Sequence, residues 1–241
     1  MNTNQATLIA ITGATGGVGA SITAASACHA LHRATGRGTL VDLDIPGPGI
    51  EVLLGVEAEP GARWPELTDA RGEVDGREVV AALPRWGRVP VLSGSRLTPV
   101  GPRDDVMLDV CAALLRAGES VVLDLPRPGA WTPAIRALVA DANDVLVVAR
   151  LSIPDAAGLI ALRSVLAKCH PRLVVRPPSV GRVDADDLTA VSGLAVVATL
   201  REERSITGAI EQGVGPPVRR GTKLARLGDD LALALGWGGA R

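Results

Sequence analysis

The sequence predicts an α/β fold with a doubly wound, mostly parallel sheet flanked by helices. Short apolar runs of strand length alternate with longer helical segments along the whole 241 residues. The chain is 47% hydrophobic but contains no Phe and no Tyr, so its core is built from Leu, Val, Ile, Ala and four Trp. A core of this composition suits buried parallel strands that helices cover on both faces.

Seven apolar runs have the length of strands. In order they are Leu8–Ile11, Thr39–Leu43, Val89–Leu92, Ser120–Leu125, Val145–Ala149, Leu173–Arg176 and Leu194–Thr199. The second run ends in the acidic turn Asp42-Leu43-Asp44, and the Pro/Gly-rich residues 45–49 that follow predict a loop. We expect irregular structure around Trp64.

The segments between these strands are predicted as helices. They are Val18–Ala34, a short helix near Arg77–Ala82, Asp105–Ala117, Pro133–Ala140, Pro154–Ala167, Asp184–Val191, Ser205–Gln212 and Thr222–Leu235. Within the third, Val106, Val110 and Leu114 recur on one face, as in an amphipathic helix. The fourth begins with proline, which the first position of a helix tolerates. Because no linker or internal repeat interrupts the alternation, we expect one domain over residues 1–241.

Charge and composition exclude several classes of function. The formal net charge is −1, and the missing Phe and Tyr remove the platforms on which bases stack, so we expect no sequence-specific nucleic-acid partner. Cys28, Cys111 and Cys169 are odd in number and far apart, which favours a reducing cytoplasm over a disulfide framework. Residues 1–7 do not resemble a signal peptide, and no apolar run is long enough to cross a bilayer. We therefore expect a cytoplasmic protein with at most peripheral membrane contact.

A glycine-rich loop follows the first predicted strand and opens the first helix. Its sequence is Ile11-Thr12-Gly13-Ala14-Thr15-Gly16-Gly17-Val18-Gly19-Ala20-Ser21. Glycines in this position let backbone N–H groups turn toward an anion at the positive end of the helix. The loop therefore predicts a phosphate-binding site.

One interpretation of the loop is a dinucleotide fingerprint. Thr12-Gly13, Gly17 and Gly19 fit the TGxxxGxG pattern of short-chain dehydrogenases. The catalytic Tyr of that family is missing, and the only asparagines are Asn2, Asn4 and Asn143. A noncatalytic NAD(P) binder therefore remains as one alternative function.

The second interpretation is that the chain resembles the ParA/MinD superfamily of deviant Walker ATPases, whose loop reads KGGxGK[ST]. The stretch Thr15–Ser21 keeps the glycines and the hydroxyl of that loop. Leu40–Asp44 resembles the acidic switch of the family, and Val121–Pro126 resembles its Walker B strand. Asp144–Val148, followed by residues 153–166, resembles the next strand–helix unit. The three motifs occur in the order and at the spacing of the family.

The resemblance narrows to the CpaE/TadZ-like branch, which includes septum-site-determining and secretion-neighbourhood CpaE-like proteins. The GGxGAS loop, Pro60–Leu67, Ala81–Pro84 and Asp124–Arg127 resemble this branch. The resemblance extends from Leu8 to about Leu235. Proteins of this branch often carry an additional N-terminal receiver-like domain, which we do not expect in this chain.

The resemblance implies a role for each residue of the site. Thr15, Gly16, Gly17, Val18, Gly19, Ala20, Ser21 and Ile22 would surround the phosphates of ATP or ADP. Ser21 and Asp124 would hold Mg²⁺ and Asp42 would support the metal, while Asp44 would be the catalytic residue that orients the attacking water. Arg176 and Pro217 would border the base.

Both lysines of the family loop are replaced, the first by Thr15 and the second by Ala20. Each lost charge-assisted hydrogen bond weakens binding by about 1.5–3 kcal/mol, and hydrolysis suffers more because it depends on charge stabilisation. We expect weak binding of nucleotide with Mg²⁺ and at most a weak ATPase, unless another cation such as Arg127 or a partner compensates.

The expected function is positioning or regulation of a cell-envelope machine, either Flp pilus or secretion assembly or the septum site. The implied partners are proteins of that machine, with a possible homodimer. The location would be the cytoplasm, or the inner face of the membrane. A nucleotide-free interaction scaffold is the main alternative.

Overall fold

The computed structural model describes residues 6–45, 47, 49–98, 100–167, 169–177 and 181–237. In this part of the chain, eight strands form one sheet in the order β3-β4-β2-β5-β1-β6-β7-β8. Only the short edge pair of β3 and β4 is antiparallel. The strands are β1 (Leu8–Gly13), β2 (Thr39–Asp42), β3 (Arg85–Trp86), β4 (Val89–Leu92), β5 (Val121–Asp124), β6 (Asp144–Arg150), β7 (Pro171–Arg176) and β8 (Val196–Thr199).

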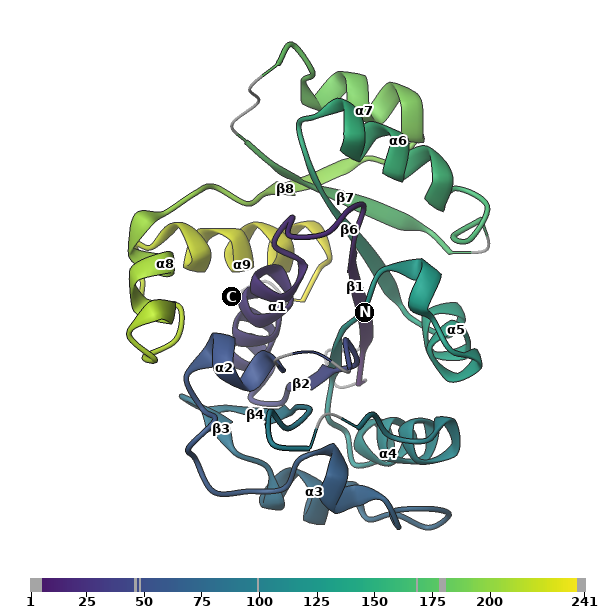
Figure 1. Cartoon of the computed structure of the whole chain (residues 1–241), viewed down its shortest axis with the longest axis vertical. Coiled ribbons are helices and arrows are strands. Elements are labelled where there is room, and N and C mark those ends of the chain that lie inside the picture. The colour runs from purple at the N-terminus through teal and green to yellow at the C-terminus, as the bar shows by residue number, and fades with distance from the viewer. Residues whose placement is uncertain are drawn as a thin grey trace.

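Helices cover both faces of the sheet, and Figure 1 shows α1 and α9 on the side opposite to α4 and α5. The α-helices are α1 (Ala20–Thr35), α2 (Ile50–Leu54), α3 (Gly76–Ala82), α4 (Asp104–Arg116), α5 (Pro133–Ala140), α6 (Ile153–Leu162), α7 (Ala185–Ser192), α8 (Arg204–Glu211) and α9 (Lys223–Ala234). Two short 3₁₀ helices span Trp64–Leu67 and Pro128–Ala130. The doubly wound, mostly parallel sheet predicted from the sequence is confirmed.

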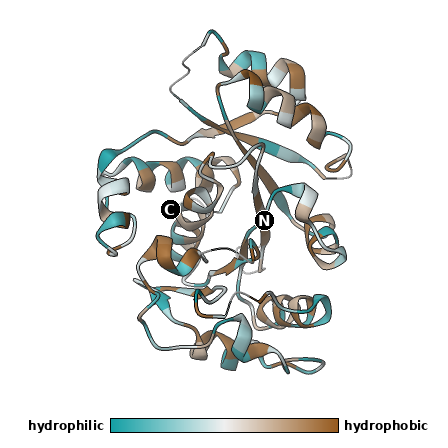
Figure 2. Cartoon of the chain, viewed as in Figure 1, coloured by the Kyte–Doolittle hydropathy of each residue, from teal (hydrophilic) through white to brown (hydrophobic). Residues whose placement is uncertain are grey.

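The core consists of two apolar layers, one on each face of the sheet. Successive residues of a strand point to opposite faces, so in β1 Leu8 and Ala10 belong to the layer that also contains residues of α4 and α5, while Ile9 and Ile11 belong to the layer that contains α1. The central strands are apolar on both faces, and Figure 2 shows them as hydrophobic. This burial on both faces fixes the carboxyl ends of the strands relative to one another.

The strand order separates this sheet from that of dinucleotide-binding proteins. In those sheets the second strand lies directly beside the first. Here β5 lies between β1 and β2, and it pairs in parallel with both. The sheet order therefore rules out the dinucleotide-binding fold that the glycine pattern alone left open.

Several elements differ from the sequence prediction in extent. Residues 45–49 are followed directly by α2, and β3 precedes β4, although neither element was predicted. The helix predicted over Pro154–Ala167 ends at Leu162, and the first helix begins at Ala20, two residues later than predicted. Among the described residues, no helix combines the length and apolar character that a membrane span requires.

Candidate functional site

The glycine loop connects the carboxyl end of β1 to the first residue of α1. Gly17 and Gly19 have φ angles of 69° and 101°, in the left-handed region that glycine adopts without strain. A Cβ atom on Gly19 would lie 2.6 Å from the Leu200 side chain. The glycine at position 19 is thus required both by the backbone conformation and by close packing.

The first turn of α1 is open toward the loop. Gly19 provides no side-chain cap, and the first turn contains no acidic residue. Its N–H groups, which have no partner within a helix, therefore present the positive end of the helix dipole. They face a cavity of about 380 Å³. Its lining includes all eight predicted phosphate-binding residues, Thr15 to Ile22, together with Gly13, Asp44, Leu53, Leu125 and Arg127.

Two buried carboxylates lie beside this cavity, at the ends of neighbouring strands. Asp42 of β2 and Asp124 of β5 are register partners and are 1% and 2% exposed. They line a second cavity of about 250 Å³, which shares Ser21 and Asp44 with the first. The structure therefore brings together the four residues predicted to hold the metal and orient water.

Burial and mutual repulsion govern the ionisation of this pair. Burial raises the pKa of Asp42 to about 6, although the backbone N–H groups of Ile50 and Asp44 donate to its carboxylate at 2.9 and 3.0 Å. Burial also raises the pKa of Asp124 well above its usual range, and the charge of Asp42 adds to this rise. The neighbouring Ser21 hydroxyl, as a hydrogen-bond donor, opposes it.

The carboxylate of Asp124 contains an unsatisfied atom. Its Oδ1 is buried and has no hydrogen-bond partner among the described residues. An acceptor left in this way is unfavourable unless a cation or donor binds to it. This orphaned oxygen, the nearby Ser21 hydroxyl and the second carboxylate fit a hard divalent cation such as Mg²⁺.

The protein alone supplies few ligands for such an ion. In the described part of the chain, no group of three or more His, Cys, Asp or Glu residues could hold a metal ion. Mg²⁺ commonly binds through one or two carboxylates together with substrate phosphates. The donor set therefore suits an ion that arrives with a phosphate ligand.

Thr15, at the position of the first family lysine, is held in a network at the start of α6. Its Oγ1 donates to Asp155 Oδ1 at 2.7 Å, and Arg150 Nη2 donates to the same hydroxyl at 3.0 Å. Asp155 is fully buried, forms an ion pair with Arg150 at 3.1 Å and accepts from the Ser152 hydroxyl. The network ties the loop to β6 and α6.

Arg176, predicted to border the base, lies at the far edge of the loop. Its Nη1 donates to the Gly17 carbonyl at 3.2 Å. The side chain lines a third cavity of about 270 Å³, with Gly19, Ile22 and residues of α8. Pro217, also predicted to border the base, is not among the residues that line this cavity.

Three contributors to the site were missed by sequence reasoning. Leu53 of α2 lines both of the first two cavities, Leu200 covers Gly19, and the Arg150–Asp155 pair holds Thr15. Each comes from a segment distant in the sequence. The acidic first turn of α6, directly after an apolar strand, was the only local signal for the last of them.

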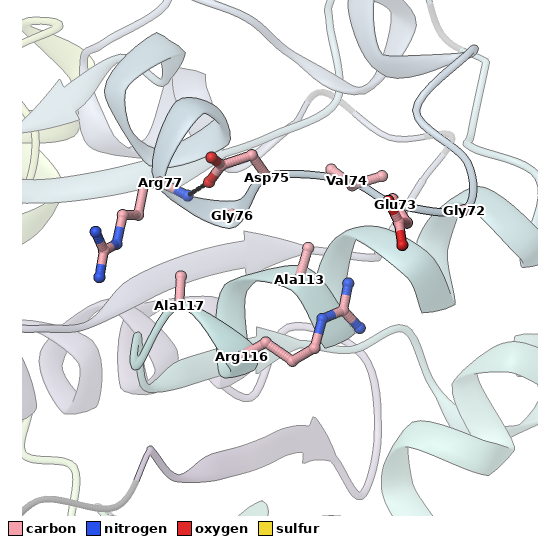
Figure 3. A pocket seen from close by; sticks show the side chains of 9 residues that line it. All are labelled: Gly72, Glu73, Val74, Asp75, Gly76, Arg77, Ala113, Arg116 and Ala117. Atoms are coloured by element: carbon pink, nitrogen blue, oxygen red, sulfur yellow. Dashed lines mark hydrogen bonds between the residues drawn. The ribbon is translucent and has the colours of Figure 1, made fainter.

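A larger cavity of about 730 Å³ lies elsewhere, between α3 and α4, and Figure 3 shows it from close by. It is a groove between the segment Gly72–Arg77 and the end of α4, bordered by exposed charged side chains. Asp75 accepts a hydrogen bond from the backbone of Arg77 there and caps α3. The charged side chains that line the groove are exposed to solvent, and that of Asp75 caps α3. They do not converge on one point as the groups around the glycine loop do.

Comparison with solved structures decides the fold. A ParA family ATPase from Chlorobium tepidum TLS superposes with a TM-score of 0.76 at 12% identity, covering 95% of this chain and 98% of that one. The cell division protein MinD of Aquifex aeolicus superposes with a TM-score of 0.75 at 17% identity, covering 98% and 99%. The fold is that of the ParA/MinD P-loop NTPases.

Sequence comparison agrees with this ParA/MinD fold. A family model described as "ParA: NUBPL iron-transfer P-loop NTPase" matches residues 4–71, which contain the glycine loop and the acidic turn. Uncharacterized proteins from two strains of Mycobacterium tuberculosis, CDC 1551 / Oshkosh and H37Rv, are each 36% identical over 223 residues, or 90% of this chain. The chain spans 61% of the length of these relatives.

Proposed function

We propose that this chain binds ATP or ADP with Mg²⁺ at the glycine loop and uses the bound state to control protein partners, with slow or absent hydrolysis. The observation that carries the proposal is that the phosphate cavity and the cavity beside the buried carboxylates adjoin each other. An uncapped helix N-terminus and a buried carboxylate with an unsatisfied oxygen open onto two cavities that share Ser21 and Asp44. The first feature suits phosphate, and the second suits the cation that accompanies it.

Each residue of the site has a role in this proposal. The N–H groups of residues 16–22 bind the phosphates, and Ser21 and Asp124 hold Mg²⁺. Asp42 acts on the metal through its neighbours, because its own oxygens accept from backbone N–H groups. Mg²⁺ would neutralise phosphate charge and relieve the repulsion between the two carboxylates. Asp44, which is exposed at the junction of the two cavities, is placed to orient water.

Slow turnover follows from the residues that replace the two family lysines. Ala20 is the first residue of α1 and has no charge to place in the phosphate cavity. The Thr15 hydroxyl donates to a buried carboxylate, so it is engaged inside its own subunit. Stabilising the charge of a transferring phosphoryl group is most of the catalysis in this chemistry.

The biological role we propose is positioning or regulation of a cell-envelope machine, as in the CpaE/TadZ-like branch. The motifs of that branch in the sequence support this proposal, as does the similarity in fold to a protein whose name assigns it to cell division. The partners would be proteins of a pilus or secretion apparatus or of the septum, at the inner face of the membrane. A homodimer formed across the nucleotide site is part of the proposal.

Titration calorimetry with ATP, ADP and NADP(H), each with and without Mg²⁺, tests the nucleotide claim. We expect heat with ATP and ADP that depends on Mg²⁺, and none with NADP(H). The variant Asp124→Ala should lose the Mg²⁺-dependent part of the binding, while the matched variant of exposed Asp141 should keep it. Absence of heat with every nucleotide would contradict the proposal and leave the nucleotide-free scaffold as the function of this fold.

A further inference from the structure

Three arginines stand around the glycine loop at the ends of consecutive strands. Arg127 follows β5, Arg150 ends β6 and Arg176 ends β7. The whole chain contains only two lysines, Lys168 and Lys223, and neither lies in the loop. The positive charge near the phosphate cavity therefore has to come from arginine.

The guanidinium of Arg150 is engaged in hydrogen bonds and an ion pair within the protein. Its Nε pairs with Asp155 at 3.1 Å, and its Nη2 donates to the Thr15 hydroxyl at 3.0 Å. Asp155 is fully buried, and a buried carboxylate needs its counter-charge in place. We therefore assign Arg150 to holding the start of the loop.

The guanidinium of Arg176 is likewise engaged in interactions within the protein, at the other side of the loop. One nitrogen donates to the Gly17 carbonyl at 3.2 Å, and another pairs with Glu202 at 3.1 Å. This bridge joins the loop to the segment between β8 and α8. Arg176 thus helps to hold the loop, with its charge balanced by Glu202.

Arg127 is one of the residues that line the phosphate cavity, and its guanidinium has no hydrogen bond or ion pair among the described residues. Its backbone, by contrast, is fixed. The Pro126 carbonyl accepts from Thr12 Oγ1 at 3.0 Å and from Trp131 Nε1 at 2.9 Å, and Ala130 N–H donates to the Arg127 carbonyl at 2.8 Å. An uncommitted cation is therefore presented to the cavity from a rigid base.

We propose that Arg127 is the cation that binds the nucleotide phosphates, in place of the lysine that is missing at position 20. Arginine is always charged, and its planar fork of donors matches two phosphate oxygens at once. Asp124, whose Oδ1 lacks a partner, precedes Arg127 by three residues on the same strand end. One segment thus supplies both a metal ligand and the phosphate-binding cation. This inference rests on the proposed nucleotide binding.

The test measures dissociation constants for Mg²⁺–ATP and Mg²⁺–ADP by calorimetry in the full chain and its variants. Arg127→Ala should bind both nucleotides about 10- to 100-fold more weakly, the range expected for a lost charge-assisted hydrogen bond. Arg136→Ala, which removes an exposed arginine from α5, should bind as the unaltered chain does. Because the Arg127 side chain makes no hydrogen bond or ion pair in the described part of the chain, the melting temperature of Arg127→Ala without nucleotide should change little.

A double variant separates a direct role from an indirect one. If Arg127 replaces the missing lysine, adding Ala20→Lys to Arg127→Ala should restore most of the lost affinity. Failure of that rescue, or an affinity of Arg127→Ala within twofold of the unaltered chain, would overturn the assignment while nucleotide binding itself stands. If the unaltered chain binds neither nucleotide, the proposed function fails, and this inference with it.

Discussion

The carboxylate pair of Asp42 and Asp124 makes the stability of the nucleotide-free protein depend on pH. The pKa of Asp42 is raised from 3.8 to about 6 in the folded chain, and that of Asp124 is raised as well. Between pH 3.8 and about 6, the unfolded and folded pKa values of Asp42, the folded state binds more protons than the unfolded state. The free energy of unfolding therefore falls as the pH rises through this window, and the contribution is level above it.

The size of the effect follows from the shift of Asp42 alone. Proton linkage with a native pKa of about 6 and an unfolded pKa of 3.8 gives a gain on the order of 1 kcal/mol between pH 7.5 and pH 5. In a chain of this length that corresponds to a rise in melting temperature of about 2–4 °C. Asp124 adds to the gain in the same direction.

The assay compares urea unfolding at the two pH values for the unaltered chain and for Asp124→Asn, without nucleotide or divalent cations. Asp124→Asn removes one of two buried carboxyls whose pKa values are both raised, so it should gain less stability than the unaltered chain between pH 7.5 and pH 5. His29, whose pKa is lowered by burial, acts in the opposite sense, but it is common to both proteins and cancels in the difference.

Exposed Asp141 provides the matched control, because Asp141→Asn should follow the pH profile of the unaltered chain. If the unaltered chain and Asp124→Asn show the same profile, the two carboxylates do not interact as described, and the electrostatic argument for a cation site is wrong.

Three further perturbations test the geometry of the loop. Ala20→Lys should bind Mg²⁺–ATP about 10- to 100-fold more tightly by calorimetry, and an unchanged affinity would count against the phosphate-binding geometry of the loop. Gly19→Ala should lower the free energy of unfolding by at least about 1 kcal/mol, because the φ of Gly19 is 101° and the new Cβ would clash with Leu200. The control is Gly16→Ala, whose Cβ would meet no atom within 4 Å, and equal stability of the two variants would contradict this prediction. Asp155→Ala should cost about 1.5–3 kcal/mol in urea unfolding through its lost charged hydrogen bonds, and Asp141→Ala should cost almost nothing.

The layers of the fold could be predicted from the sequence because the spacing of apolar residues along each segment matches the face that the segment buries. The central strands are apolar on both faces, and the helices carry one apolar stripe, so both patterns are readable locally. The glycine loop, the acidic turn Asp42–Asp44 and Asp124 were also readable, since each lies at the carboxyl end of a strand of the predicted sheet. A shared edge of a parallel sheet then places them together.

The parts that were not predicted depend on contacts between distant segments. The helix α2 has only five residues, too few to show a helical period. It begins where Ile50 N–H donates to Asp42, and its buried Glu51 pairs with Arg63 at 2.9 Å. The order of the strands and the engagement of Thr15 by Asp155, 140 positions away, likewise have no local pattern.

The central claim is that the backbone N–H groups of the glycine loop bind the phosphates of a nucleotide. Hydrogen–deuterium exchange on adding Mg²⁺–ATP tests it most directly, because the method reports on backbone amides. The account predicts slower exchange for the amides of residues 16–22, at the loop and the first turn of α1, and no such change when Mg²⁺ is withheld. Nucleotide binding that leaves these amides exchanging at their original rate would contradict it.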